Sequence, residues 1–367
     1  MMSVMILSTF SLTKLLLNVE HVLIFLALLS VLILFHEFGH FLMAKRCGVT
    51  VTDFALGFGP SLLAARRGET TYRINALPLG GYCKMVGEDS ADDGTLGPGN
   101  FQRKSIAARA GIIVAGPIFN LILAVLVFMA LGLTAGVPNN VTNVVESVQP
   151  GSPAEAAGLR AGDRIRALDG KAMRSGTELV EYIHGHAGKF VAVDVMHDGT
   201  VRHLRIIARP HMVGGHVEGQ FGFVPTVGYA RLPFVAAVQY GFVGVAETIG
   251  LQFAGVTGAI RAHDASVISG PVGIARVVIG VESYGWQRTI GLAASISVIL
   301  GVFNLLPFPA LDGGRLAFLL VEAVRGRPVD AEKEGLVHLT GFALLMVLVI
   351  FVTYHDIVQW VHGQGGL

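Results

Sequence analysis

Charged residues are scarce in this sequence. Asp, Glu, Lys and Arg make up 14% of its 367 residues, whereas hydrophobic residues make up 52%. Soluble domains carry about 25% charged residues, so the composition argues against an ordinary soluble protein. The net charge is only +1 and the basic residues are scattered, which argues against binding to nucleic acid. The composition instead indicates a protein of the lipid bilayer that carries a soluble insert.

Cysteine is almost absent as well. Cys47 and Cys83 are the two cysteines, and neither belongs to a CxxC pair. This spacing argues against a disulfide framework and favours a compartment in which thiols stay reduced. Cys47 could ligate a metal, although a buried apolar position is the favoured interpretation. Residues 1–10 lack the basic flank and the cleavage site of a secretory signal, so we expect this segment to be retained.

Four long apolar stretches are predicted to cross the bilayer as helices. They cover about residues 22–44, 110–134, 289–311 and 336–354, each near the roughly 20 residues that a span requires. Lys and Arg gather after the first stretch, before the second, and between the third and fourth. The positive-inside rule therefore places those loops in the cytoplasm and both termini outside. The prediction is a multi-pass α-helical membrane protein with four transmembrane helices, divided into an N-terminal membrane half, 1–137, and a C-terminal membrane half, 289–367.

The loop between the first two spans has strand-like composition. Residues 49–58 and 70–84 are rich in residues that favour strands and are interrupted by Gly and Pro. We expect a membrane-associated β-loop over 70–86, on the cytoplasmic side and close to the first span. Its edge could pair with an extended peptide through unpaired backbone groups, although an ordinary hairpin is an equally good interpretation.

The segment after the second span has soluble character, with charges and turns. Its run from Ser152 to Gly170 carries the pattern SPA, AGL, GDRI and LDG, which is similar to the pattern of PDZ domains. The resemblance implies an inserted α+β PDZ domain over 138–210. PDZ domains bind peptide termini or internal strands by strand addition, and a steric module without a ligand is the alternative. The sequence does not identify the PDZ ligand.

Residues 211–288 are predicted to be a linker that contains a helix on the membrane surface. The stretch 232–260 is apolar but is interrupted by Gln239, Glu247 and Gln252. These polar side chains favour an amphipathic helix at the outer interface over a fifth span.

The first span contains the sequence His36-Glu37-Phe38-Gly39-His40. Residues four apart lie on one face of a helix, about 6 Å apart along its axis, so two imidazoles there can bind one metal ion. In the HExxH pattern the two His bind zinc, and the Glu is the general base for a water that the metal acidifies. Ionisable side chains at membrane depth are costly and indicate function. We therefore predict a zinc site with His36 and His40 as ligands and Glu37 as the base.

A catalytic zinc site needs a third protein ligand. Asp312 is the one carboxylate besides Glu37 that the predicted topology brings to the same depth, in the sequence NLLPFPALDGGR that ends the third span. The prolines and glycines are expected to unwind the helix end there, and helix capping is the alternative role for Asp312. In the second span, Asn120 follows Gly116-Pro117. It either faces the metal or bridges two helices, and bridging is favoured.

Together, HEFGH in the first span and NLLPFPALDGGR at the end of the third resemble the site-2 protease family of intramembrane zinc metalloproteases. The resemblance covers nearly the whole chain, including GxxxN in the second span, GGY in the β-loop and the PDZ pattern. It is strongest to the bacterial regulator-of-sigma-E protease branch, in a form with one PDZ domain. It implies that His36, His40 and Asp312 bind Zn²⁺, that Glu37 activates the water, and that no further small-molecule cofactor is needed.

The same resemblance implies a substrate site beside the metal. Asn304 would hold the substrate or stabilise the oxyanion of the tetrahedral intermediate, with helix capping as an equally good alternative. The other expected substrate-binding residues lie in the β-loop and after the third span: Asn75, Leu77, Gly80, Gly81, Tyr82 and Pro307.

Partners and location also follow from the resemblance. The family cleaves transmembrane segments of single-span membrane proteins, such as anti-sigma factors or signal-peptide remnants, and its PDZ domain and interfacial helix exclude substrates with bulky outer domains. We expect a place in the bacterial cytoplasmic (inner) membrane, with the PDZ domain outside and the active site toward the cytoplasm. The alternative is a non-catalytic membrane scaffold that presents a PDZ domain, against which the intact Glu37 counts. A transporter with a broken third helix would be supported by an internal repeat, and the sequence shows none.

Overall fold

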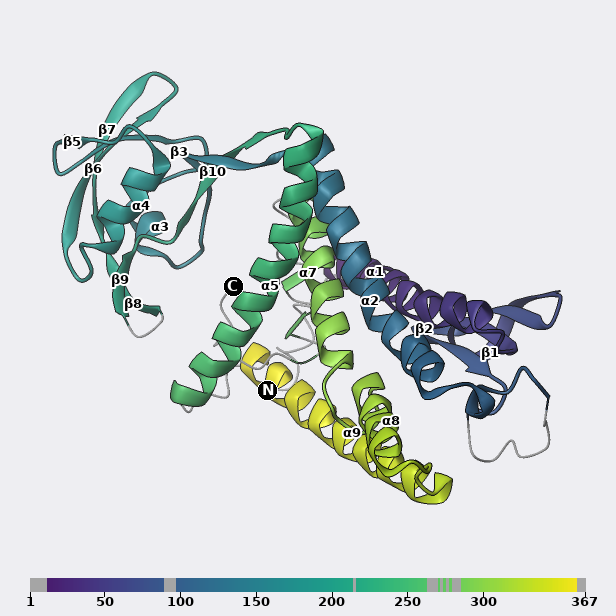
Figure 1. Cartoon of the computed structure of the whole chain (residues 1–367). Coiled ribbons are helices and arrows are strands. Elements are labelled where there is room, and N and C mark those ends of the chain that lie inside the picture. Colours follow the sequence, from purple (N-terminus) through teal and green to yellow (C-terminus); the bar gives the residue numbers. More distant parts are fainter. Residues whose placement is uncertain are drawn as a thin grey trace. The chain divides into compact units, whose positions relative to one another are not determined.

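The computed structural model describes residues 12–88, 97–213, 216–262, 270, 273–274, 277–278 and 285–361 (Figure 1). The chain divides into two compact units. The first, the membrane unit, comprises Met1–Met129 and Val238–Leu367; the second, the sheet unit, comprises Ala130–Ala237. Residues 1–10, which we expect to be retained, lie outside the described residues.

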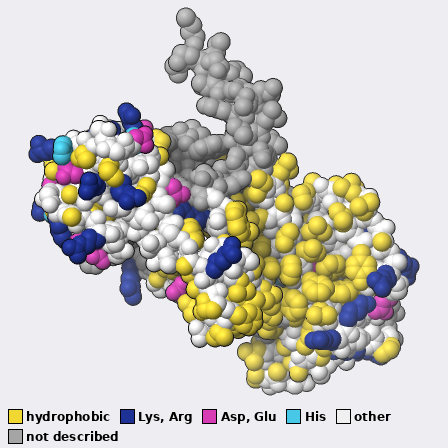
Figure 2. Space-filling view, turned by 90° about the horizontal axis from the view of Figure 1, so that it is seen from above, with side chains coloured by type: hydrophobic (Ala, Val, Ile, Leu, Met, Phe, Trp, Pro, Cys, Tyr) yellow, Lys and Arg dark blue, Asp and Glu magenta, His cyan; other side chains and the backbone are white. Residues whose placement is uncertain are grey.

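Five helices among the described residues are long and apolar enough to cross a membrane. They are α1 (Leu12–Arg46), α2 (Ile106–Thr134), α5 (Phe234–Ala262), α7 (Trp286–Asn304) and α9 (Ala331–Val361). Figure 2 shows hydrophobic side chains covering most of the visible face of the membrane unit, whereas charged side chains are spread over the sheet unit. Such apolar helices, with all backbone groups bonded internally, are the structures that a bilayer accepts. The chain is a multi-pass helical membrane protein with a β-sheet insert.

Helix α5 covers the stretch for which we predict a helix on the membrane surface. It is long enough to span, but it is less apolar than α2 because it contains Gln239, Glu247 and Gln252. By length and composition, α5 is a fifth candidate span. The number of four spans therefore stays a prediction.

Strands β1 (Val51–Arg67) and β2 (Thr70–Met85) form the predicted β-loop. Their pairing shows that both strands double back on themselves. Ala55 of β1 pairs with Tyr82 on one side and with Arg73 on the other. The hairpin is therefore a small antiparallel sheet rather than a simple two-stranded ribbon.

Within this hairpin, segment 51–57 is central and segment 81–85 forms one edge. Gly57 and Gly59 lie where β1 bends, and their φ angles of +82° and +84° are in the region that glycine tolerates. The base of the hairpin packs against α1 and α2 through a cluster of buried residues: Ala44, Val49, Val51, Cys83, Met85, Phe101, Ile112, Ile113 and Leu319. This packing fixes the edge segment 81–85 beside α1.

Helix α7 ends at Asn304, and α8 (Asp312–Arg325) begins after a non-helical loop. The helix therefore ends within the predicted third span, 289–311, where the prolines and glycines are expected to unwind it. Pro307 and Pro309 prevent the helix from continuing, because proline lacks the N–H that a helix interior needs and its ring clashes with the preceding turn.

The loop before α8 is held by α9. Ala310 has a φ of +77°, a strained conformation for a residue with a side chain. Its backbone N–H donates to Nδ1 of His338 on α9 at 3.0 Å, and the ring of Phe318 on α8 packs on the same imidazole. Helices α8 and α9 accordingly lie side by side (Figure 1).

The sheet unit is built on a six-stranded antiparallel sheet. Its strand order is β10-β3-β4-β6-β7, with β5 paired to β4. The strands are β3 (Val137–Val148), β4 (Arg164–Leu168), β5 (Lys171–Ala172), β6 (Phe190–His197), β7 (Thr200–Ile207) and β10 (Phe223–Ala230). Helices α3 (Pro153–Ala156) and α4 (Gly176–His184) begin after Ser152 and Ser175, whose hydroxyls accept the capping hydrogen bonds. The arrangement is PDZ-like.

The sheet unit extends beyond the limits predicted for the PDZ domain. Strand β10 lies in the segment predicted as a linker, yet it pairs with β3. The same segment also contributes a separate hairpin of β8 (Arg209–Val213) and β9 (His216–Gln220). The limits of 138–210 for the PDZ domain remain a prediction.

Candidate metal centre

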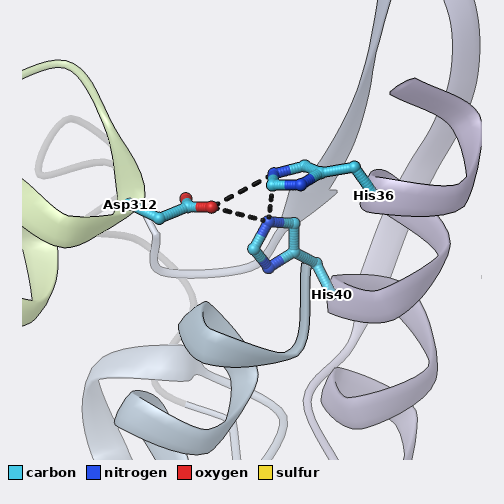
Figure 3. Close-up of side chains that lie close together, drawn as sticks. All are labelled: His36, His40 and Asp312. Carbon is cyan, nitrogen blue, oxygen red and sulfur yellow. Dashed lines mark hydrogen bonds and ion pairs between the residues drawn. The ribbon is translucent and has the colours of Figure 1, made fainter. Parts of the chain in front are cut away.

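His36 and His40 lie one turn apart on α1, and Asp312 is the first residue of α8 (Figure 3). Their side chains point to one spot. Nε2 of His36 lies 3.2 Å from Nε2 of His40, and Oδ2 of Asp312 lies 3.1 Å and 3.3 Å from these two nitrogens. Both histidines are buried. The structure thus brings together the three residues that we predict as metal ligands.

The geometry of these donor atoms fits one zinc ion. Tetrahedral zinc has bonds of about 2.0–2.2 Å to imidazole nitrogen and carboxylate oxygen, which places neighbouring donors roughly 3.3 Å apart. The three observed separations, 3.1, 3.2 and 3.3 Å, match this spacing. Oδ2 of Asp312 is buried without a hydrogen-bond partner, a state that a cation would relieve. Three protein ligands leave a fourth position open, as in catalytic zinc sites.

The tautomer of His40 is set by the backbone of α2. Nδ1 of His40 lies 2.9 Å from the carbonyl oxygen of Ile112. A carbonyl only accepts, so Nδ1 carries the proton and donates it, which leaves the lone pair of Nε2 free for a metal.

The side chain of Asn120 lies at Nδ1 of His36, just as the carbonyl group of Ile112 lies at Nδ1 of His40. Nδ2 of its buried side-chain amide lies 3.3 Å from Nδ1 of His36. Metal binding through Nε2 requires a proton on Nδ1, and that proton needs an acceptor. Turning the amide by 180° would bring Oδ1, which has no hydrogen-bond partner, to Nδ1 as that acceptor. The backbone oxygen of Asn120 also accepts from the hydroxyl of Ser297 on α7 at 2.8 Å. Asn120 therefore bridges helices, with its side chain on α1 and its backbone oxygen on α7.

We expect Asn120→Leu to weaken zinc binding about 10- to 100-fold, the usual effect of losing a hydrogen-bond partner of a metal ligand. Asn120→Asp keeps an acceptor oxygen and should retain most of the affinity. Competition with a chelator of known zinc affinity measures both variants. Ser297→Ala is the matched control, because it removes only the backbone contact of Asn120. Equal affinity in Asn120→Leu and the wild type would show that the amide does not set the tautomer.

Two glycines allow the helices to approach the centre closely. A Cβ at Gly116 would overlap Nε2 of His40, and a Cβ at Gly39 would overlap the carbonyl oxygen of Ala115. Any larger residue at either position would push α1 and α2 apart at the ligands. Helix α2 continues through Pro117 rather than ending there.

A cavity of about 540 Å³ opens beside the three ligands. Glu37, the predicted base, lines it, as do Asn304 and Tyr82, two of the predicted substrate-binding residues. Burial raises the pKa of the Cys83 thiol, which lies in the same lining. The cluster of close donor atoms among the described residues does not include this thiol.

Gly81 lies between the hairpin and the predicted base. A Cβ at this position would lie 2.8 Å from the carbonyl oxygen of Ala55 and 3.4 Å from Cγ of Glu37. The absence of a side chain at Gly81 thus lets the edge segment 81–85 approach Glu37.

Other predicted substrate-binding residues have contacts within the hairpin instead. Nδ2 of Asn75 donates to the carbonyl oxygen of Gly57 at 2.9 Å. Gly80 has a φ of +116° and faces the ring of Phe58, and Leu77 is largely exposed. The described lining of the cavity does not include Asn75, Leu77, Gly80 or Pro307. Their role in substrate binding stays a prediction.

Two ion pairs near α8 were missed by sequence reasoning. Arg109 pairs with Glu322, and Arg315 pairs with Glu88. The partners lie 213 and 227 residues apart in the chain, so no local spacing indicates them.

Comparison with known proteins agrees with this geometry. The family model for peptidase family M50 matches residues 24–348. A Clostridium acetobutylicum protein is 36% identical over 339 residues, covering 90% of this chain and 95% of that protein. Zinc metalloprotease RasP of Geobacillus kaustophilus is 31% identical, covering 93% and 98%. Regulator of sigma-W protease RasP of Bacillus subtilis is also 31% identical, covering 92% and 98%.

Among solved structures, the PDZ domain of an SdrC-like protein of Listeria monocytogenes matches 24% of this chain and 90% of its own, with 28% identity and a TM-score of 0.21. The match to the family model extends over both membrane halves, and so includes HEFGH and the sequence around Asp312. The chain belongs to peptidase family M50, and it is a zinc metalloprotease.

Proposed function

We propose that this protease hydrolyses peptide bonds within the transmembrane segments of single-span membrane proteins. The observation that carries the proposal is the place of the metal centre. His36, Glu37 and His40 lie on α1, within a stretch long and apolar enough to cross a bilayer. A peptide bond that reaches them has to come from a segment that is itself at membrane depth.

The side chains of the centre divide the chemistry between them. When bound, zinc acidifies a water and polarises the carbonyl of the scissile bond. Glu37 takes the proton from the attacking water and delivers it to the leaving amide nitrogen. Asn304, which lines the same cavity, holds the substrate backbone or donates to the oxyanion.

Hydrolysis requires the substrate helix to unwind first, because a helix engages its carbonyl groups in hydrogen bonds to the fourth residue along. The edge segment 81–85 can offset those lost bonds. Its residues Tyr82 to Met85 line the cavity, and an edge strand offers unpaired backbone groups to an extended chain. Substrate pairing along this edge would place a peptide bond next to Glu37.

The sheet unit serves as a gate in this proposal. Strand β10 lies at the edge of its sheet and could accept a peptide strand, as PDZ domains do. We infer a place in the bacterial cytoplasmic membrane with the sheet unit outside, and substrates that are anti-sigma factors or signal-peptide remnants. The similarity to a regulator of sigma-W protease supports the first of these classes.

Cleavage of a tagged single-span protein by the purified full-length chain in detergent tests the proposal. Mass spectrometry of the products locates the cleaved bond, which we expect within the transmembrane segment. A zinc chelator should stop cleavage, and zinc added back in equimolar amount should restore it.

The matched control substrate replaces the natural transmembrane segment with an uninterrupted leucine helix, which resists unwinding and should be cleaved more slowly. Cleavage confined to soluble loops would contradict the membrane substrate. A zinc-loaded protein that cleaves none of a panel of single-span proteins would favour a scaffold that presents its sheet unit.

A further inference from the structure

A buried ion pair joins α8 to the start of α2. Nη1 of Arg109 donates to Oε2 of Glu322 at 3.0 Å, and Nη2 of Arg109 pairs with Oε1, so the contact is bidentate. The side chain of Arg109 is 6% exposed and that of Glu322 14%. Oε1 of Gln102 accepts a further hydrogen bond from Nη1 at 3.2 Å. Removing two charges from water is costly, and apolar residues of similar volume often stabilise a fold as well, so stability alone does not explain this pair.

Both partners belong to helices that contribute to the metal centre. Glu322 lies on α8, about 15 Å along the helix axis from Asp312, the first residue of that helix. Arg109 lies on α2, one turn before Ile112, whose carbonyl oxygen orients His40. The ion pair therefore ties the helix that supplies the carboxylate to the helix that orients one imidazole.

A second ion pair supports the other end of α8. Arg315, one turn after Asp312, pairs with Glu88, which follows β2. Arg315 and Glu88 both line the cavity beside the ligands. The short helix α8 is thus attached at its first and last turns to the part of the membrane unit that carries the two histidines.

We propose that the Arg109–Glu322 pair is a positioning device that docks α8 so that Asp312 reaches His36 and His40. The inference rests on the proposed role of Asp312 as third ligand. Because a helix of this length is stiff, movement of its last turn displaces its first turn as well. Loss of the pair should therefore lower zinc affinity while leaving the ligand set intact.

Zinc affinity of the full-length protein, measured by competition with a chelator, tests the inference. We expect Glu322→Gln and Arg109→Gln each to weaken zinc binding by about tenfold, the lower end of the effect of outer contacts on metal sites. The double variant should bind zinc as tightly as the single variant that has the lower zinc affinity, because the two side chains act as one unit. Glu69→Gln is the control: Glu69 pairs with Lys45 in the same unit, but its side chain is 51% exposed.

A double-mutant cycle with Asp312→Asn separates positioning from general destabilisation. If the pair acts through Asp312, then Glu322→Gln should have no further effect on zinc affinity in the Asp312→Asn background. Thermal unfolding of the metal-free proteins checks that each variant folds. If Glu322→Gln does not fold, Glu322→Asp keeps the charge but shortens the reach, and it should show the same loss that depends on Asp312.

Wild-type zinc affinity in a folded Glu322→Gln protein would overturn the inference. So would a Glu322→Gln substitution that lowers zinc affinity by the same factor in the wild-type and Asp312→Asn backgrounds. Failure of the ligand assignment gives a different result. In that case Asp312→Asn alone would bind zinc as tightly as the wild type.

Discussion

Replacing Glu37 by glutamine is expected to stop proteolysis while leaving zinc in place. Glutamine has nearly the same shape as glutamate but cannot take a proton from the attacking water. General-base catalysis contributes about 10²- to 10⁴-fold to such reactions, so the rate of cleavage should fall by at least that range. Glu37 lies beside the three ligands but is not one of them, since the close donor atoms belong to His36, His40 and Asp312. Zinc content per protein should therefore match that of the wild type.

The measurement combines single-turnover cleavage of a single-span substrate with metal analysis of the same preparation. Glu37→Asp is the informative control, because it keeps the carboxylate but withdraws it by one methylene, and it should retain a small part of the activity. A Glu37→Gln protein that has lost both zinc and activity would instead place Glu37 among the groups that hold the metal. Full activity with full zinc would remove Glu37 from the mechanism.

The sequence predicts the first two ligands because helical spacing is local. His36 and His40 are four residues apart, and any helix through that stretch places them on one face. Asp312 needed a further argument, which combined the positive-inside rule with the cost of a carboxylate at membrane depth. Both arguments depend on general physical rules rather than on packing. The structure accordingly places the three donor atoms within ligand distance of one another.

Contacts that depend on the rotation of one helix against another could not be predicted in this way. Asn120 illustrates the limit, because its spacing from Gly116 does not show which neighbour its amide faces. The structure places that amide at Nδ1 of His36. Arg109 is a stronger example: its charge predicts the cytoplasmic end of a span, whereas its burial against Glu322 depends on the packing of two distant segments.

In the fold, too, features set by local sequence patterns were predictable and features set by packing were not. Apolar stretches of spanning length predict helices, and the described structure has helices at all four predicted positions. The doubling back of β1 and β2 was not predictable, because alternating composition gives strands but does not say that Ala55 pairs on both sides. The end of α7 before Pro307 and Pro309 was predictable, because proline is excluded from helix interiors.

Replacing Asp312 by asparagine is expected to weaken zinc binding by more than the roughly 10- to 100-fold that loss of an outer hydrogen-bond partner costs. Asparagine has the same shape, so α8 can still begin at this residue. It removes the negative charge, however, and an amide oxygen is a much weaker zinc ligand than a carboxylate. Dialysis against a chelator of graded concentration, followed by metal analysis, measures the loss. Proteolysis should fall in parallel with zinc content.

Asp330→Asn is a suitable control for this substitution, because it changes a carboxylate in the turn before α9, where the side chain only caps that helix. The zinc affinity of the Asp330→Asn protein should equal that of the wild type. Wild-type affinity in Asp312→Asn would instead require another third ligand, and the described residues offer no second cluster of three His, Cys, Asp or Glu side chains. The protein would then hold zinc by two histidines alone, or Glu37 would have to be a ligand. The Glu37→Gln protein separates these two cases, because only the second predicts that it loses zinc.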